Sequence, residues 1–365
     1  MRKTGFFVDE KCFWHSGGNY ALTAPVGGFV QPLAAGGLPE NPETKRRLKN
    51  LLHVTGLAEE LDCLTSPPAT QQDLLRIHPA RYLDKFKALS DDQGGEIGLR
   101  TPFGPGGYEI AALSAGLVIG AMNSVMNGTH KNAYALSRPP GHHCLPDWSN
   151  GFCLLANIAI AIEASPAKRV AVVDWDVHHG NGTETIFIER DDVLTISIHQ
   201  ENNYPLNSGG VETIGKGAGK GFNMNIPLPP GAGHDTYLYA MQKLVLPRLQ
   251  MFQPDLIVVA CGYDASGVDP LSRMLCGAET FRLMTRQLMQ AADNLCDGRL
   301  VMAHEGGYSE VHVPFCGHAV LQEMSGSSID AGDALGQRIS GQQPSAVMQN
   351  IFASMIDDMV TGYGL

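Results

Sequence analysis

The stretch RVAVVDWDVHHGNGT, residues 169–183, sets the expected fold. Its first part is a continuous apolar and β-branched run, which is typical of a strand buried on both faces of a parallel sheet. The run leads directly into acids and histidines that core packing does not require. Because alternate side chains of an extended chain share a face, we expect Asp174, Asp176 and His178 to point the same way.

Similar runs recur along the chain, and each ends in polar or glycine-rich residues: NAYALS (132–137), VLTISIH (193–199), DLIVVACGYD (255–264) and RLVMAHEGGY (299–308). Helical spacing of apolar residues predicts helices over 108–126, 152–163, 236–251 and 278–294. The alternation predicts an α/β fold, in which one domain spanning 1–365 contains a doubly wound, mainly parallel sheet flanked by helices. Residues 1–41 are predicted to be a Gly/Pro-rich loop region before a helix from about Pro42.

Composition limits the kinds of protein this chain can be. The eight cysteines are widely spaced without a CxxC pair, and the N-terminus lacks the apolar stretch of a signal peptide, so we expect reduced thiols and a cytoplasmic location. No uninterrupted run of about eighteen apolar residues is present, so no membrane span is expected. The net charge of −11 argues against a nucleic-acid partner.

Polar residues collect where the predicted strands end. Asp174, Asp176 and His178 end one strand and Asp264 ends another, while Tyr308 and the pair His142–His143 follow two more. Ligands of open parallel sheets bind beyond the carboxyl ends of the strands. We therefore expect one crevice to hold all of these side chains.

Two carboxylates on one face repel each other unless a cation lies between them. A single divalent ion bound by Asp176, His178 and Asp264 would resolve that conflict, and three protein ligands leave a coordination position open, as in catalytic zinc sites. Zn²⁺ in such a site lowers the pKa of a water molecule, and Fe²⁺ or Co²⁺ suits the same donors. Taken separately, each residue also has a structural interpretation as a helix cap, a loop histidine or a core tyrosine.

Several motifs together resemble those of the zinc-dependent histone deacetylase superfamily, most closely its class II branch and the bacterial histone deacetylase-like amidohydrolases. The resemblance covers about residues 40–325 and rests on RPPGHH (138–143), GFC (151–153), DWDVHHGNGT (174–183), LTISIH (194–199), GYDA (262–265), DPL (269–271) and EGGY (305–308). It implies an arginase/deacetylase-like sheet.

The resemblance also implies roles for individual residues. The implied zinc ligands are Asp176, His178 and Asp264. The implied catalytic residues are His142 and His143, their partners Asp174 and Asn181, and Tyr308. The implied substrate-binding residues are Gly151, Phe152, Tyr204 and Gly306. A K⁺ site is implied at Asp174, Asp176, His178, Ser197 and Ile198. Some relatives have an acid at the rim that binds the substrate backbone, for which Glu96 is the candidate here.

These features predict a zinc-dependent hydrolase that removes acetyl or other acyl groups from lysine ε-amines of proteins or peptides. The alternatives are an amidohydrolase acting on acetylpolyamines or other small acylated amines, and a non-enzymatic acyl-lysine-binding module. A binuclear manganese enzyme of the ureohydrolase type would need further bridging acids, which are not found beside Asp176 and Asp264. The Pro/Gly-rich segment 24–39 is expected either to cover the channel or to contact another subunit of a homo-oligomer.

Overall fold

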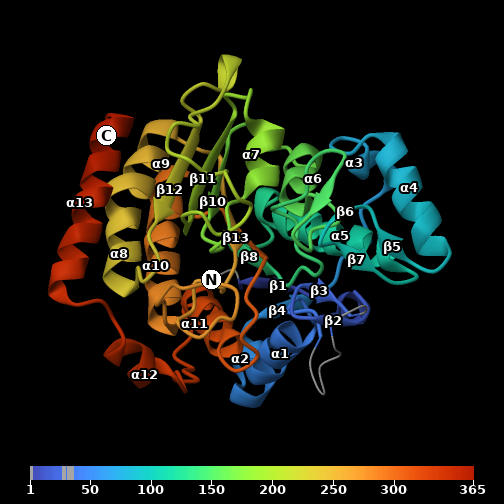
Figure 1. The fold of residues 1–365 in the computed structure, drawn as a ribbon, viewed down its shortest axis with the longest axis horizontal. Coiled ribbons are helices and arrows are strands. Elements are labelled where there is room, and N and C mark those ends of the chain that lie inside the picture. Colours follow the sequence, from blue (N-terminus) through green and yellow to red (C-terminus); the bar gives the residue numbers. More distant parts are fainter. Residues whose placement is uncertain (1–2, 27–29, 31–36) are drawn as a thin grey trace.

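An eight-stranded sheet runs through the centre of the structure, a computed structural model that describes residues 3–26, 30 and 37–365 (Figure 1). The strand order is β12-β11-β10-β13-β14-β8-β1-β4, and every neighbouring pair is parallel. The chain runs outward from β10 to the β12 edge and then returns to insert β13 and β14 between β10 and β8. The predicted doubly wound α/β class is therefore confirmed.

The strands of this sheet are Gly5–Phe7 (β1), Asp62–Leu64 (β4), Asn132–Ala135 (β8), Val170–Asp174 (β10), Val193–Gln200 (β11), Asn223–Leu228 (β12), Leu256–Cys261 (β13) and Leu300–His304 (β14). The five predicted strands are confirmed as β8, β10, β11, β13 and β14. The sequence did not predict β1 and β4, which have three residues each, or β12, in which Asn223 and Asn225 interrupt the apolar run. Pro227 is tolerated in β12 because that strand lies at an edge of the sheet.

Short strands outside the central sheet form three pairs among the described residues: Tyr20–Ala21 (β2) with Ala24–Pro25 (β3), Gly95–Glu96 (β5) with Pro102–Phe103 (β7), and Gly98–Leu99 (β6) with Ser149–Asn150 (β9). The last pair joins two loops that are far apart in the sequence.

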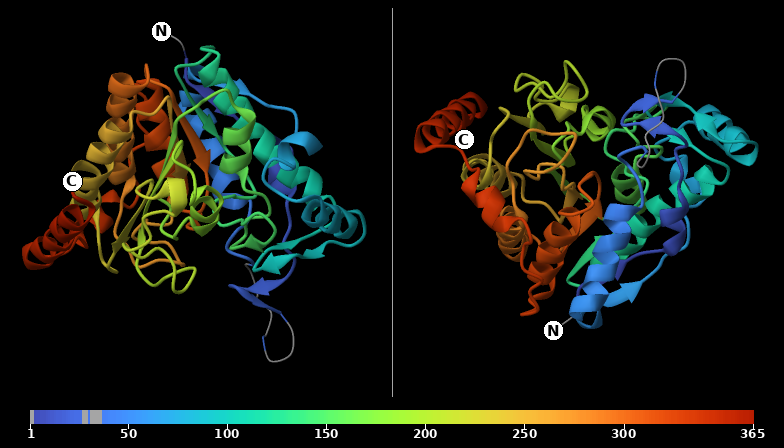
Figure 2. Two further views of the ribbon diagram at one scale, coloured as in Figure 1. Left: turned by 90° about the horizontal axis from the view of Figure 1, so that it is seen from above. Right: turned by 60° about the horizontal axis from the view of Figure 1, so that its bottom comes forward.

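Helices cover both faces of the sheet (Figure 2). Residues of Glu43–Thr55 (α1), His234–Ala240 (α8), Leu246–Phe252 (α9), Ala278–Leu295 (α10), Val313–Ser325 (α11) and Ala346–Tyr363 (α13) contribute to one hydrophobic cluster. Residues of Gln71–Leu74 (α3), Ala80–Asp91 (α4), Gly107–Met126 (α5), Asn157–Ala164 (α6) and Asn181–Phe187 (α7) contribute to the other. The remaining elements are Leu57–Glu60 (α2), Gly336–Gly341 (α12), the short 3₁₀ helices Glu10–Trp14 (η1) and Gly217–Gly219 (η2), and the π-helix Met241–Val245 (η3).

Strand β10 shows why the sheet separates two cores. Ala171 and Val173 pack in the first cluster, whereas Val170 and Val172 pack in the second. Both sets are apolar, so a side chain on either face of the strand is removed from water. Burial of such aliphatic side chains contributes roughly 1.5–3 kcal/mol each.

Three predicted segments differ from the structure. Residues 236–251 form two α-helices joined by the π-helix η3, because Pro247 has no N–H to donate within the helix. The helix predicted over 152–163 begins only at Asn157, since Gly151 and Phe152 have φ values of 50° and 68° that no helix accommodates. The predicted loop region 1–41 contains a strand of the central sheet, β1, although part of it, residues 1–2, 27–29 and 31–36, lies outside the described residues.

Helix α5 departs from the expectation that no segment could span a membrane, because it is long and apolar enough to do so by length and composition. In the fold, 67% of its most apolar window is buried, and its residues belong to the second hydrophobic cluster. The helix is apolar all round because it packs as an interior element.

The cysteines are all free, as expected from their spacing. Seven of the eight are buried, and Cys63 on the edge strand β4 is exposed. No described pair forms a disulfide.

Close packing of α5 gives a stability prediction. A Cβ at Gly116 would lie 2.2 Å from the backbone oxygen of Pro67, whereas one at Gly362 in α13 would meet nothing within 4 Å. We expect Gly116→Ala to lower the free energy of unfolding by about 2 kcal/mol or more, and Gly362→Ala to leave it unchanged or slightly raised. Urea denaturation measures both, and equal stabilities of the two variants would contradict this packing.

Candidate active site

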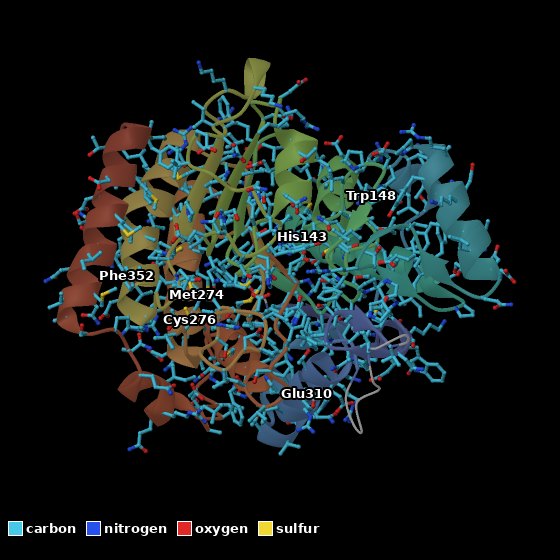
Figure 3. The ribbon with its side chains drawn as sticks, in the orientation of Figure 1. His143, Trp148, Met274, Cys276, Glu310 and Phe352 are labelled. Atoms are coloured by element: carbon cyan, nitrogen blue, oxygen red, sulfur yellow. The ribbon has the colours of Figure 1, made fainter. Side chains whose placement is uncertain are left out.

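Four adjacent strands, β10, β13, β14 and β8, bring the polar residues together. Asp176 and His178 follow β10, Asp264 follows β13, Tyr308 follows β14, and the histidine pair follows β8. All four strands are parallel, so their carboxyl ends meet at one edge of the sheet. His143 accordingly lies near the middle of the molecule (Figure 3).

The three residues predicted to bind a metal are close together and buried. His178 Nδ1 lies 3.1 Å from Asp176 Oδ1 and 3.0 Å from Asp264 Oδ2, and the three ligand atoms lie within 4.8 Å of one another. Backbone amides orient both carboxylates: Gly306 N–H donates to Asp176 Oδ2 (2.8 Å), and Val177 N–H donates to Asp264 Oδ1 (2.7 Å).

The donor set fits a divalent cation. One imidazole nitrogen carries at most one proton, so it cannot donate well to two carboxylates at once. The two acids also differ in how readily they ionise. Burial and the charge of Asp176 raise the pKa of Asp264 to about 6. The charges of His142 and His178 outweigh burial and hold the pKa of Asp176 below its usual range. A cation between the two carboxylates would offset their repulsion, so that both could be ionised. Two oxygen donors with one nitrogen donor suit Zn²⁺, Fe²⁺ or Co²⁺.

The tandem histidines have different partners. His142 Nδ1 lies 2.9 Å from Asp174 Oδ2, and His143 Nδ1 lies 2.7 Å from Asn181 Oδ1. Burial disfavours the imidazolium of His142, but Asp176 and Asp174 outweigh it and raise its pKa to about 10. Burial, with the charges of His142 and His178, holds the pKa of His143 well below its usual value. The site therefore contains one histidine that tends to be charged and one that tends to be neutral.

Two residues that the sequence did not identify hold the histidine segment. Glu305 is fully buried, and its Oε2 accepts from the N–H groups of Gly141 (2.7 Å) and His142 (3.1 Å). Cys153 Sγ accepts from His143 N–H at 3.4 Å. Glu305 stands in the EGGY motif, so an acid at a buried strand end was the only sequence signal for it.

Tyr308 has a comparable positioning partner. Its backbone N–H donates to Asp269 Oδ2 (2.7 Å), and the other oxygen of that carboxylate accepts from Leu271 N–H (2.8 Å). Burial, with the negative charges of Asp264 and Asp176, raises the pKa of the Tyr308 phenol well above its usual value. The hydroxyl therefore stays protonated and can donate a hydrogen bond.

A pocket of about 140 Å³ opens above these groups, lined by Thr23, Arg100, His143, Gly151, Phe152, His178, Asn203, Tyr204, Leu271 and Tyr308. Phe152 and Tyr204 line it as expected for substrate-binding residues, and Gly151 also lies on it. The Tyr204 hydroxyl donates to Asn150 Oδ1, so it is already engaged within the protein.

Gly306 does not lie where we expected. It is not among the residues that line the pocket. A Cβ at this position would be 2.2 Å from Asp264 Oδ2 and 2.6 Å from Asp176 Oδ2. Gly306 therefore packs directly against the two carboxylates, and no side chain larger than a hydrogen atom fits at this position.

The residues of the implied K⁺ site lie on two paired strands and the loop after β10. Ser197 of β11 is the register partner of Asp174 at the end of β10, and Ile198 follows it. The Ser197 hydroxyl lies 2.9 Å from His199 Nδ1. His179 contacts Ser208 and Glu184 and is not part of the candidate metal-binding group.

His78 fixes the loop that leads to Phe152. Its Nδ1 lies 2.7 Å from the Pro146 carbonyl oxygen, and its Nε2 lies 3.0 Å from the Ala156 nitrogen. The neutral ring satisfies both contacts, by donating from Nδ1 and accepting at Nε2. Burial outweighs that bond to Pro146 and lowers the pKa of His78 to about 4.

A buried ionic group joins the segment before α1 to the histidine segment. Glu40 Oε1 lies 2.9 Å from Arg138 Nε and 3.4 Å from Lys45 Nζ, and Arg138 Nη1 donates to the Cys12 carbonyl oxygen. Arg138 and Lys45 outweigh burial and lower the pKa of Glu40 to about 2. The two cations share one carboxylate, so Glu40 and Arg138 form a buried ion pair, whereas burial lowers the pKa of Lys45.

Comparison with known proteins gives a consistent result. The model of the histone deacetylase domain matches residues 38–324. The histone deacetylase-like amidohydrolase of Pseudomonas aeruginosa is 55% identical, covering 100% of this chain and 97% of that protein. A probable deacetylase of Archaeoglobus fulgidus is 36% identical over 80% of this chain and 84% of its own length. The crystal structure of the HDA15 HD domain superposes with a TM-score of 0.80 at 29% identity, covering 100% and 99% of the two chains.

The cation site predicts a specific stability response. Saturating Zn²⁺ is expected to raise the thermal unfolding midpoint of the metal-free protein by about 5 °C or more. Asp264→Asn is expected to lose most of that rise without lowering the metal-free midpoint, because the amide oxygen keeps the bond from Val177 and one of two repelling charges is gone. Asp174→Asn, at a buried acid outside the triad, serves as control. An undiminished rise in Asp264→Asn would exclude this donor set.

His78 predicts a pH dependence of stability. The pKa of about 4 in the fold lies below the 6.5 of an unperturbed histidine, so the folded state favours the neutral ring. The contribution of the neutral His78 ring to the free energy of unfolding is fully present above pH 6.5 and is lost as the pH falls toward 4. We expect the wild type to lose about 3 kcal/mol more unfolding free energy between pH 7 and 4 than His78→Gln. The exposed His53→Gln of α1 is the control, and a wild-type loss equal to that of His78→Gln would contradict the prediction.

Proposed function

This chain belongs to the histone deacetylase family, and from that premise we propose that it is a zinc-dependent hydrolase that removes acetyl or other acyl groups from lysine ε-amines. The observation that carries the proposal is a pocket lined by His143, Tyr308 and His178, of which His178 also belongs to the candidate cation-binding triad. Together these groups meet the requirements of amide hydrolysis: activation of water, protonation of the amine and stabilisation of the oxyanion.

The residues of this chain divide the reaction between them. Asp176, His178 and Asp264 would hold a divalent ion, which would supply Lewis acidity to the acyl carbonyl and to water. His143 accepts a proton from water, because its neutral form is favoured, and then returns the proton to the leaving amine. Tyr308 donates a hydrogen bond to the carbonyl oxygen as negative charge develops on it.

The remaining residues orient substrate and charge. The walls Phe152 and Tyr204 suit the aliphatic stem of an acyl-lysine, and the carbonyl of Gly151, which also lines the pocket, would accept the amide N–H. His142, paired with Asp174, carries the positive charge of the histidine pair and so disfavours a second charge on His143. Two charged imidazoles with ring centres 4.0 Å apart would repel.

The Arg100 guanidinium on the pocket wall bears on the alternatives. An acetylated polyamine brings positive charges to that guanidinium, which disfavours small polyamine substrates electrostatically. A module that only binds acyl-lysine would need neither His143 nor Tyr308 in the pocket. The K⁺ site, the cytoplasmic location and a homo-oligomeric state remain predictions.

Activity assays of two tyrosine variants test the proposal. We expect Tyr308→Phe to lower kcat for an Nε-acetyl-lysine peptide by roughly a hundredfold, the cost of losing one oxyanion donor, while zinc content is unchanged. Tyr204→Phe, in the same pocket, loses only the bond to Asn150 and is expected to keep most of its activity. A chelator should abolish acetate release and added Zn²⁺ should restore it. Wild-type activity in Tyr308→Phe would refute the proposed role.

A further inference from the structure

Arg100 is attached to the wall of the pocket by its backbone. It follows β6, which pairs with β9, and it has a left-handed φ of 58°. The Leu99 carbonyl oxygen accepts from Gly151 N–H (3.0 Å), and the Arg100 carbonyl oxygen accepts from Phe152 N–H (2.9 Å). The residue is thereby fixed to the two positions that line the channel.

The side chain of Arg100 lies on Tyr204. Its guanidinium carbon is 5.3 Å from the centre of the Tyr204 ring, and the same ring lies 5.1 Å from the ring of His143. Stacking on an aromatic face orients the planar guanidinium but uses none of its N–H donors. Those N–H donors therefore remain available at the mouth of the pocket, where the Tyr204 ring lies between Arg100 and His143, the proposed general base.

The charge of Arg100 is not compensated by an acid of the described residues. Arg81, on the neighbouring helix α4, is ion-paired with Asp147, but Arg100 has no such partner. The carboxylate of Glu96, our candidate for a rim acid, accepts from Thr101 N–H (2.8 Å) and does not line the pocket. The segments outside the described residues contain no Asp or Glu. In a chain of net charge −11, the mouth thus has an unpaired positive group.

We propose that Arg100 binds a carboxylate of the substrate, and that the preferred substrates are Nε-acyl-lysines whose own α-carboxylate is free, as the single amino acid or at the C-terminus of a peptide. This inference rests on the proposed function. The four-carbon stem of lysine separates the ε-amide from the α-carbon, so an amide at His143 places the α-carboxylate near the mouth. A guanidinium fork matches a carboxylate with two parallel hydrogen bonds.

A matched pair of substrates tests the assignment. Peptides ending in Nε-acetyl-lysine as the free acid or as the carboxamide differ only in that charge. We expect the wild type to prefer the acid by about tenfold in kcat/KM, mainly through KM. Arg100→Gln should reduce the preference to about one, because the acid then has no guanidinium to bind. Arg100→Lys should keep part of the preference, because the charge remains but the fork is lost.

Arg81→Gln is the control, since it removes one positive charge from an arginine that already has an acidic partner, and it should keep the full preference. A wild-type preference of about one, or a preference that persists in Arg100→Gln, would overturn the inference. If neither peptide were hydrolysed, the proposed function would fail instead. Calorimetric binding of the same peptides to zinc-loaded Tyr308→Phe tests Arg100 independently of turnover, and equal affinities for acid and carboxamide would overturn it.

Discussion

Two buried carboxylates, Asp176 and Asp264, face the same nitrogen of His178, and their mutual repulsion is the constraint on which the site depends. Both lie in the protein interior, where water cannot screen them, so a positive charge must accompany them. The fold holds them in place through backbone amides of neighbouring segments. Gly306 contributes such an amide, and the absence of a side chain there leaves room for the carboxylates. The proposed roles of His142, His143 and Tyr308 depend on their lying close to these two carboxylates.

The central sheet was predictable because its inner strands are buried on both faces, which leaves continuous apolar runs in the sequence. The polar residues after β10 and β13 were predictable as neighbours, since parallel strands present their carboxyl ends at one edge. Strands β1 and β4 were not predictable, because three residues are too few to show periodicity and their pairing is imposed by the rest of the sheet. The start of α6 was displaced by the left-handed Phe152, a conformation that residue type does not indicate.

Within the site, the residues missed from the sequence share a physical reason. Glu305, Asp269 and His78 act by binding backbone groups of segments far away in the sequence, and such contacts leave no local pattern. Arg100 lies at the rim, where the resemblance to known deacetylases implied only an acid. Conversely, Gly306 was predicted to bind substrate, whereas its amide donates to Asp176 and its lack of a side chain leaves room for both carboxylates. Motifs therefore identified the groups that do the chemistry better than the groups that position them.

The exposure of a single thiol has a practical consequence for handling this molecule. Cys63 lies on β4, the edge of the sheet separated from β14 by β8 and β1, while the other seven sulfurs are enclosed by the fold. A maleimide dye or a biotin tag would consequently attach at one defined point of the native chain. Immobilised through that point, every molecule on a sensor chip would have the same orientation, without any engineered handle.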